Sequence, residues 1–133
     1  MPADSSAAVH LDANGVVAIG DSNTRLGVAA ARWLADGVLL HVSALAWAEF
    51  QNGPPTGLPP GDDATARRLI AAIIPVGQAE AELAARLFNT TGRRSRSLPD
   101  CVIAASAILA GAPLATENTA DFAPFLAHGL TLA

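Results

Sequence analysis

Short apolar segments alternate with longer amphipathic segments along the whole of this 133-residue chain. Strands are predicted where apolar runs of strand length end in turn-forming residues, at 9–13, 38–42, 73–76 and 113–116, with 130–133 as a candidate last strand. Helical spacing of apolar residues fills the intervals between them. Strands that alternate with helices predict an α/β fold with a central parallel sheet flanked by α-helices on both faces. The length fits a single domain over residues 1–133.

The amphipathic segments have recognisable ends. Helices are predicted over 24–35, 44–51, 62–72, 78–89, 98–110 and 120–127, with a helical turn over 16–20. Ser43 and Asp62 are suitable N-caps for two of them, and Ser97 or Leu98 is the expected N-cap of the helix that has Pro99 in its first turn. The proline- and glycine-rich segment 52–61 and the basic segment 90–97 are expected to be loops.

The composition is apolar for a water-soluble domain, with 51% hydrophobic residues, which raises the question of a membrane segment. Apolar runs such as 104–109 fall far short of the roughly 18–20 residues that a spanning helix needs. Residues 1–8 lack the basic and apolar regions of a secretory signal. With Cys101 as the single cysteine, no internal disulfide and no zinc-finger site is possible. We therefore expect a cytoplasmic protein with no membrane partner.

The charge is unusual for a protein that handles nucleic acid. The net charge is −4, and all eight cationic side chains are arginines. Because phosphate neutralisation supplies much of the affinity for nucleic acids, binding here would need a local arginine patch or a bound metal ion. Arg93, Arg94 and Arg96 form the densest cationic cluster. They are candidates for phosphate contacts, and a solvated loop is an equally good interpretation.

Four acidic residues stand out because their neighbours are apolar or turn-forming. Asp12 ends the first predicted strand, Glu49 interrupts an apolar helix, Asp100 opens the helix over 98–110, and Asp121 follows the fourth strand. Ligands of open α/β sheets bind outside the carboxyl ends of the strands, where Asp12 lies. The predicted fold lets the four acids converge there.

Converging carboxylates favour one kind of chemistry. They repel each other, so some would stay protonated unless a cation neutralised them. Mg²⁺ and Mn²⁺ prefer oxygen ligands and keep several waters. Such an ion acidifies water for nucleophilic attack and neutralises charge on a phosphate group. The acids therefore indicate a metal-dependent hydrolase of phosphodiester bonds.

Four segments, taken in order, are similar to one known family. They are Leu-Asp-Ala-Asn at 11–14, Val-Ser-Ala-Leu-Ala-Trp-Ala-Glu-Phe at 42–50, Leu-Pro-Asp-Cys-Val-Ile-Ala-Ala at 98–105 and Leu-Ala-Thr-Glu-Asn-Thr-Ala-Asp-Phe at 114–122. Each segment alone is a weak signal, but their order and spacing over nearly the whole chain resemble a PIN domain. The resemblance is to the VapC-type toxins of bacterial toxin–antitoxin pairs.

This resemblance implies an endoribonuclease that uses Mg²⁺ or Mn²⁺ and cleaves structured RNA such as transfer or ribosomal RNA. It also implies a homodimer that a cognate antitoxin neutralises. Asp12, Glu49, Asp100 and Asp121 take the acidic positions of the family, and Asn14, Ser43, Thr116 and Asn118 take the polar positions that line the same pocket. Asp12 and Asp100 are the predicted direct metal ligands, and Glu49 acts through water. Many PIN domains have an aspartate where this chain has Asn118.

Each acid also has an ordinary interpretation when taken alone. Asp100 suits a helix N-terminus because of the helix dipole, Glu49 suits the polar face of a helix, and Asp121 suits a cap. One rival function is a phosphatase of the haloacid-dehalogenase type. That site needs a second aspartate where this chain has Asn14, and the chain has no lysine for the phosphate. The other rival is a PIN-like domain that binds nucleic acid or a partner without cleavage, for which Asn118 leaves room.

Overall fold

A computed structural model describes residues 7–53, 62–91 and 97–133 of the chain. The described strands are β1 (Ala8–Leu11), β2 (Leu39–Ser43), β3 (Ala72–Ile74) and β4 (Leu114–Ala115). The described helices are α1 (Ala13–Ile19), α2 (Arg25–Ala35), α3 (Ala44–Asn52), α4 (Asp63–Leu69), α5 (Gln78–Thr90), α6 (Ser97–Ala110) and α7 (Thr119–Phe122), followed by the 3₁₀ helix η1 (Ala123–His128).

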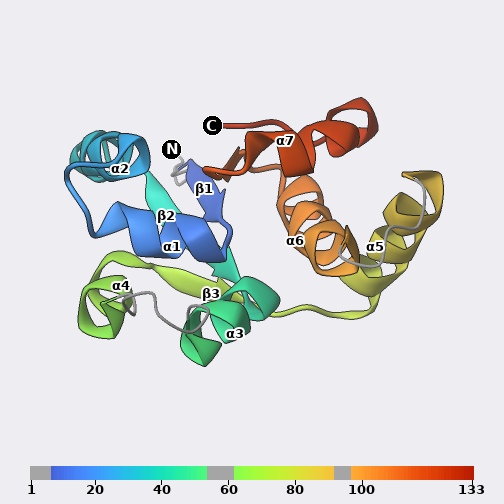
Figure 1. Cartoon of the computed structure of the whole chain (residues 1–133), viewed down its shortest axis with the longest axis horizontal. Helices are drawn as coiled ribbons and strands as arrows, with labels where there is room; N and C mark the ends of the chain where they lie inside the picture. The colour runs from blue at the N-terminus through green and yellow to red at the C-terminus, as the bar shows by residue number, and fades with distance from the viewer. Residues whose placement is uncertain (1–6, 54–61, 92–96) are drawn as a thin grey trace, which may run out of the picture.

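The four strands form one parallel sheet in the order β3-β2-β1-β4. Helices α1, α2 and α4 lie on one side of the sheet, and α5 and α6 lie on the other (Figure 1). The predicted α/β fold with helices on both faces is therefore confirmed. Because all four strands run in the same direction, their carboxyl ends lie at one edge of the sheet, where ligands of such folds bind.

The core lies between the two middle strands and the helices that cover them. Leu11, Leu40 and Val42 have no exposed surface in β1 and β2. On α6, the buried residues include Ala104, Ala105 and Ala107, whose small side chains allow this helix to approach its neighbours closely. Cys101 is buried on the same helix, as expected for a small apolar residue. None of the described helices is long and apolar enough to cross a membrane.

A histidine occupies the centre of the sheet. His10 of β1 is paired in register with His41 of β2, and the two rings meet edge to face with centroids 5.7 Å apart. His10 is 1% exposed, and both of its ring nitrogens lack a hydrogen-bond partner among the described residues. Burial, followed by repulsion from His41, lowers the pKa of His10 to about 4. His10 is therefore a neutral packing residue at physiological pH.

Three predicted boundaries were wrong in the second half of the chain. The helix expected over 62–72 ends at Leu69, because the chain turns extended at Ile70 and pairs as β3 with β2. The helix expected over 120–127 is divided into α7 and η1, since Pro124 lacks the N–H that a continuous α-helix needs. The segment 130–133 makes only an isolated bridge between Leu132 and Leu114.

The predicted ends of two other helices were also displaced. The expected turn over 16–20 is a helix that already begins at Ala13 and has Asp12 as its N-cap. Leu98 lies inside α6, which begins at Ser97, so Leu98 is not its N-cap. Residues 54–61 and 92–96, which include Arg93, Arg94 and Arg96, lie outside the described residues, so the structure does not test the two loops expected there.

Candidate active site

Asp12 is held at the carboxyl end of β1 by two separate elements. It is the N-cap of α1, and its Oδ1 accepts the Gly15 backbone N–H at 2.7 Å. Its Oδ2 accepts the Thr116 hydroxyl at 2.5 Å, a contact between positions 104 residues apart in sequence. Asp12 is 4% exposed. The orientation of this carboxylate is thus fixed, and each oxygen keeps a second lone pair for another partner.

Thr116 connects Asp12 to the segment that follows β4. Its hydroxyl donates to Asp12 and accepts the Asn118 backbone N–H at 2.9 Å. Its carbonyl accepts Nη2 of Arg25 at 3.0 Å. Asn118 therefore contributes to this arrangement through its backbone N–H. The residue itself is exposed to solvent. Thr116 is buried, so these bonds are shielded from water.

Ser43 ends β2, the strand beside β1, and starts the helix that carries Glu49. Its buried hydroxyl accepts the Ala46 backbone N–H at 3.2 Å, so the predicted N-cap is confirmed. Its role is to begin α3 next to the site. Asn14 lies exposed in the first turn of α1.

Asp100 interacts electrostatically with the other three acids, as its pKa shift shows. Burial and then repulsion from Asp121, Glu49 and Asp12 raise the pKa of Asp100 to about 6. Burial and then Asp12 raise the pKa of Glu49. Burial also raises the pKa of Asp12, against the opposing effect of its hydrogen bonds from Thr116 and Gly15. Side chains from the end of β1 and from α3, α6 and α7 thus share one region of negative potential.

Within the part of the chain that the structure describes, no arginine neutralises this region. The ion pairs there join Arg25 to Glu117 and Arg67 to Asp63, and none involves the four acids. Nor are three or more histidine, cysteine, aspartate or glutamate side chains of the described residues arranged to ligate one metal ion. The donor set therefore does not fit a closed all-protein metal cage. It fits Mg²⁺ or Mn²⁺, which one or two carboxylates hold while waters fill the other positions.

Three residues at this site escaped the sequence reasoning. Gly15 supplies the N–H to Asp12, and a Cβ there would lie 3.0 Å from both the Ala115 carbonyl oxygen and Asp12 Oδ1. Arg25 and Glu117 flank Thr116, with 3.8 Å between Nη2 and Oε2. The Asp12 cap was a local signal for Gly15, because an N-cap bonds the backbone three residues on. Nothing local pointed to Arg25.

The sequence matches the PIN domain family over residues 9–123. The chain belongs to the PIN domain family. This match contains all four segments on which the resemblance rested, so the expected family is confirmed. Nothing among curated protein sequences matched the chain significantly.

Solved structures with the same fold include several toxin–antitoxin complexes. VapBC2 from Rickettsia felis, bound to a DNA fragment from its promoter, aligns at 18% identity and a TM-score of 0.67, over 95% of this chain and 97% of that one. VapBC-1 from nontypeable Haemophilus influenzae aligns at 18% identity and a TM-score of 0.67, over 95% of this chain and 96% of that one. A toxin–antitoxin complex from Klebsiella pneumoniae aligns at 24% identity and a TM-score of 0.64, over 86% of this chain and 90% of that one. These similarities show that this PIN domain has the same fold as those chains.

Proposed function

We propose that this PIN domain protein is a metal-dependent endoribonuclease and the toxin of a type II toxin–antitoxin pair. The observation that carries the proposal is the group of Asp12, Glu49, Asp100 and Asp121 at the ligand-binding edge of the sheet, where burial and then repulsion from the other three acids raise the pKa of Asp100 to about 6. Four carboxylates without a cationic side chain among the described ion pairs form an arrangement that a divalent cation stabilises.

Asp12 and Asp100 would hold Mg²⁺ or Mn²⁺, with Asp12 oriented by its bonds from Gly15 and Thr116. When bound, such a cation supplies charge neutralisation for a phosphate group and acidifies water. Glu49 would orient the attacking water, and its raised pKa suits it to accept a proton at a carboxylate oxygen. Asp121 completes the acidic wall, and Asn14, Ser43 and Asn118 support the pocket.

The substrate and the partners follow from the family. We expect structured RNA, transfer or ribosomal, with Arg93, Arg94 and Arg96 on its phosphates. The solved neighbours are toxin–antitoxin complexes, which supports a cognate antitoxin as partner. A homodimer in the cytoplasm completes the proposal.

Cleavage of total RNA by the purified protein with Mg²⁺ or Mn²⁺ tests the proposed activity. Asp12→Asn and EDTA should each abolish it, with a loss above the about 10–100-fold typical of residues that only support a metal ligand. Glu82→Gln, an exposed change on α5, is the matched control and should cleave as wild type does. Equal cleavage by wild type and Asp12→Asn would mean a contaminating nuclease or a different site.

The non-cleaving alternative has one observation in its favour. Asn118 removes a carboxylate from a position where many PIN domains have one, and the structure uses the backbone of this residue. If the purified protein retains an RNA without cutting it under any metal condition, binding replaces hydrolysis as its function.

A further inference from the structure

Arg25 joins the start of α2 to the end of β4. Its Nη2 donates to the Thr116 carbonyl oxygen at 3.0 Å and lies 3.8 Å from Oε2 of Glu117. The ion pair is long, and the Arg25 side chain is 57% exposed, so solvent screens it. The charge-assisted bond to the carbonyl is the stronger of the two contacts. Arg25 therefore acts mainly on the backbone of Thr116.

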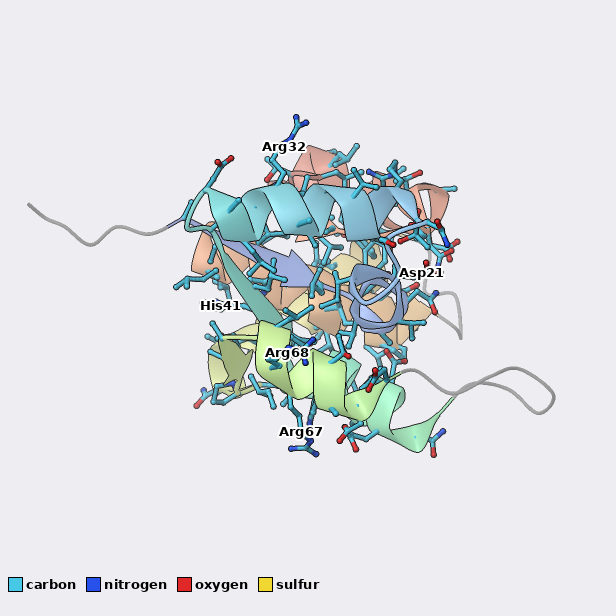
Figure 2. All side chains as sticks on the ribbon, turned by 90° about the vertical axis from the view of Figure 1, so that its left-hand side faces the viewer. Asp21, Arg32, His41, Arg67 and Arg68 are labelled. Atoms are coloured by element: carbon cyan, nitrogen blue, oxygen red, sulfur yellow. The ribbon has the colours of Figure 1, made fainter. Side chains whose placement is uncertain are left out.

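The backbone that carries Arg25 is fixed to α1. The Thr24 hydroxyl is shared between the carbonyl oxygens of Ala18 at 2.9 Å and Asp21 at 2.8 Å, and it accepts the Gly27 N–H at 2.9 Å. A Cβ on Gly27 would lie 1.8 Å from the Asp21 carbonyl oxygen, so only glycine permits this turn. Figure 2 shows Asp21 beside the N-terminal end of α2. The guanidinium thus extends from a rigid connection.

These contacts form a closed circuit around the site. Asp12 caps α1, the end of α1 bonds to Thr24, and the next residue is Arg25. Arg25 holds the Thr116 carbonyl, and the Thr116 hydroxyl returns to Asp12. Because β4 stays paired with β1 up to Ala115, the circuit acts on Thr116, the residue that follows β4. Loss of the Arg25 contact would most affect the bond from the Thr116 hydroxyl to Asp12 Oδ2, which is the side-chain hydrogen bond that joins these two strand ends among the described residues.

We propose that Arg25 is a positioning residue, which holds the Thr116 hydroxyl on the Asp12 carboxylate and so keeps that carboxylate oriented toward the cation. This inference rests on the proposed metal-dependent function. Arg25 itself contacts neither the cation nor the reacting phosphate. Direct phosphate binding is the competing role, but the guanidinium is already engaged by a carbonyl and lies beside the Glu117 carboxylate.

Two substitutions and one matched control test the inference. Arg25→Met removes the bond to Thr116, and Arg25→Lys keeps a cation that can make a single such bond. Arg32→Met is the control, because Arg32 lies seven residues further along the same helix and points away from the sheet (Figure 2). Affinity for Mn²⁺ alone is measured by calorimetry, and the exchange rate of the Asn118 amide, which bonds to Thr116, is measured by NMR.

Arg25→Met should bind Mn²⁺ about tenfold more weakly, as is usual when a partner that orients a metal ligand is lost. Its Asn118 amide should exchange faster than in wild type. Arg25→Lys should restore part of both properties, and Arg32→Met should change neither. Circular dichroism confirms that each variant is folded.

Unchanged Mn²⁺ affinity and unchanged Asn118 exchange in Arg25→Met would overturn the inference, and a raised KM for RNA alone would then make Arg25 a substrate contact. If wild type binds no Mn²⁺, the proposed metal dependence of the function is wrong. The Asn118 exchange rate alone then decides whether Arg25 holds Thr116, so the two failures are separable.

Discussion

The four carboxylates of the site differ in how the protein holds them. Asp12 is buried, and hydrogen bonds to both of its oxygens offset part of the cost of its charge. Asp100 is half-buried, and no hydrogen bond from the described residues reaches its carboxylate. Burial and three neighbouring acids disfavour the charged form of Asp100 when no cation is bound. Asp100 is therefore the acid at which function most directly opposes stability.

Asp100→Asn should stabilise the metal-free protein at pH 7. The folded-state pKa of about 6 exceeds the ordinary value of 3.8, so wild type loses stability as the pH rises through this interval. The shift corresponds to about 3 kcal/mol at full value and to about 1 kcal/mol after allowance for solvent screening of this half-exposed group. Thermal unfolding in EDTA should show a Tm gain of about 4 °C at pH 7 that disappears below pH 4.

Glu82→Gln, where no such crowding exists, is the reference for removing a negative charge and should leave the Tm near that of wild type. An equal gain in both variants would mean that net charge, rather than the local repulsion at Asp100, sets the difference. The same Asp100→Asn protein should have lost cleavage.

At this scale the sequence predicted the acids but not their supports. Asp12, Glu49 and Asp100 interrupt apolar stretches, so local contrast marks them. Arg25 has no such mark, because its partner Thr116 is 91 residues away and accepts through its backbone. His10 was also hidden, since an apolar strand gives no sign that one imidazole will be buried without a partner.

At the scale of elements, two strand ends are also helix starts. Asp12 directly follows β1 and caps α1, and Ser43 ends β2 and caps α3. Each cap is a single side chain that satisfies a backbone N–H and fixes the direction in which the chain leaves the sheet. Such caps are local, which is why Ser43 and Asp62 could be predicted as caps from sequence.

Ser43→Ala should weaken both α3 and the site that α3 supplies. The loss of a buried cap leaves the Ala46 N–H without its partner and costs about 1–2 kcal/mol of unfolding free energy. Asp62→Ala, at the exposed cap of α4, should cost less stability than Ser43→Ala and leave cleavage intact. Urea denaturation and RNA cleavage measure the two effects. Loss of cleavage in Asp62→Ala as well would show that general destabilisation, not α3, is responsible.

The boundaries that the sequence missed are set by distant partners. The Ala71 N–H bonds to the Leu40 carbonyl oxygen at 2.8 Å and draws the chain into β3, although its own periodicity favours a longer α4. At the C-terminus, Leu114 bonds to Thr131 and Ala133, but β4 is too short to form a ladder there. Neither outcome is encoded in local periodicity, because each depends on which strand lies alongside.

For the molecule as a whole, the parallel sheet determines the position of the candidate active site. Asp12, Ser43 and Thr116 lie at the carboxyl ends of β1, β2 and β4, which are three adjacent strands, and so lie at one edge. Asp100 on α6 then interacts electrostatically with Asp121 on α7, Glu49 on α3 and Asp12. The shared edge could be predicted from sequence because parallel strands end on the same side of the sheet. The bonds that orient the carboxylates could not.

Metal binding should reverse the order of stability of wild type and Asp100→Asn. Without metal, Asp100→Asn is the more stable, since one repelling charge is gone. Mn²⁺ at 100 times its Kd stabilises the protein that binds it by about 2.7 kcal/mol, or roughly 8–10 °C in Tm, and this exceeds the gain from the substitution. Wild type should therefore have a higher Tm than Asp100→Asn in Mn²⁺ and a lower Tm in EDTA. NaCl of equal ionic strength is the control. If the two melting curves keep the same order in both conditions, the repulsion at Asp100 is not relieved by a divalent cation, and the acids of this PIN domain do not form a metal site.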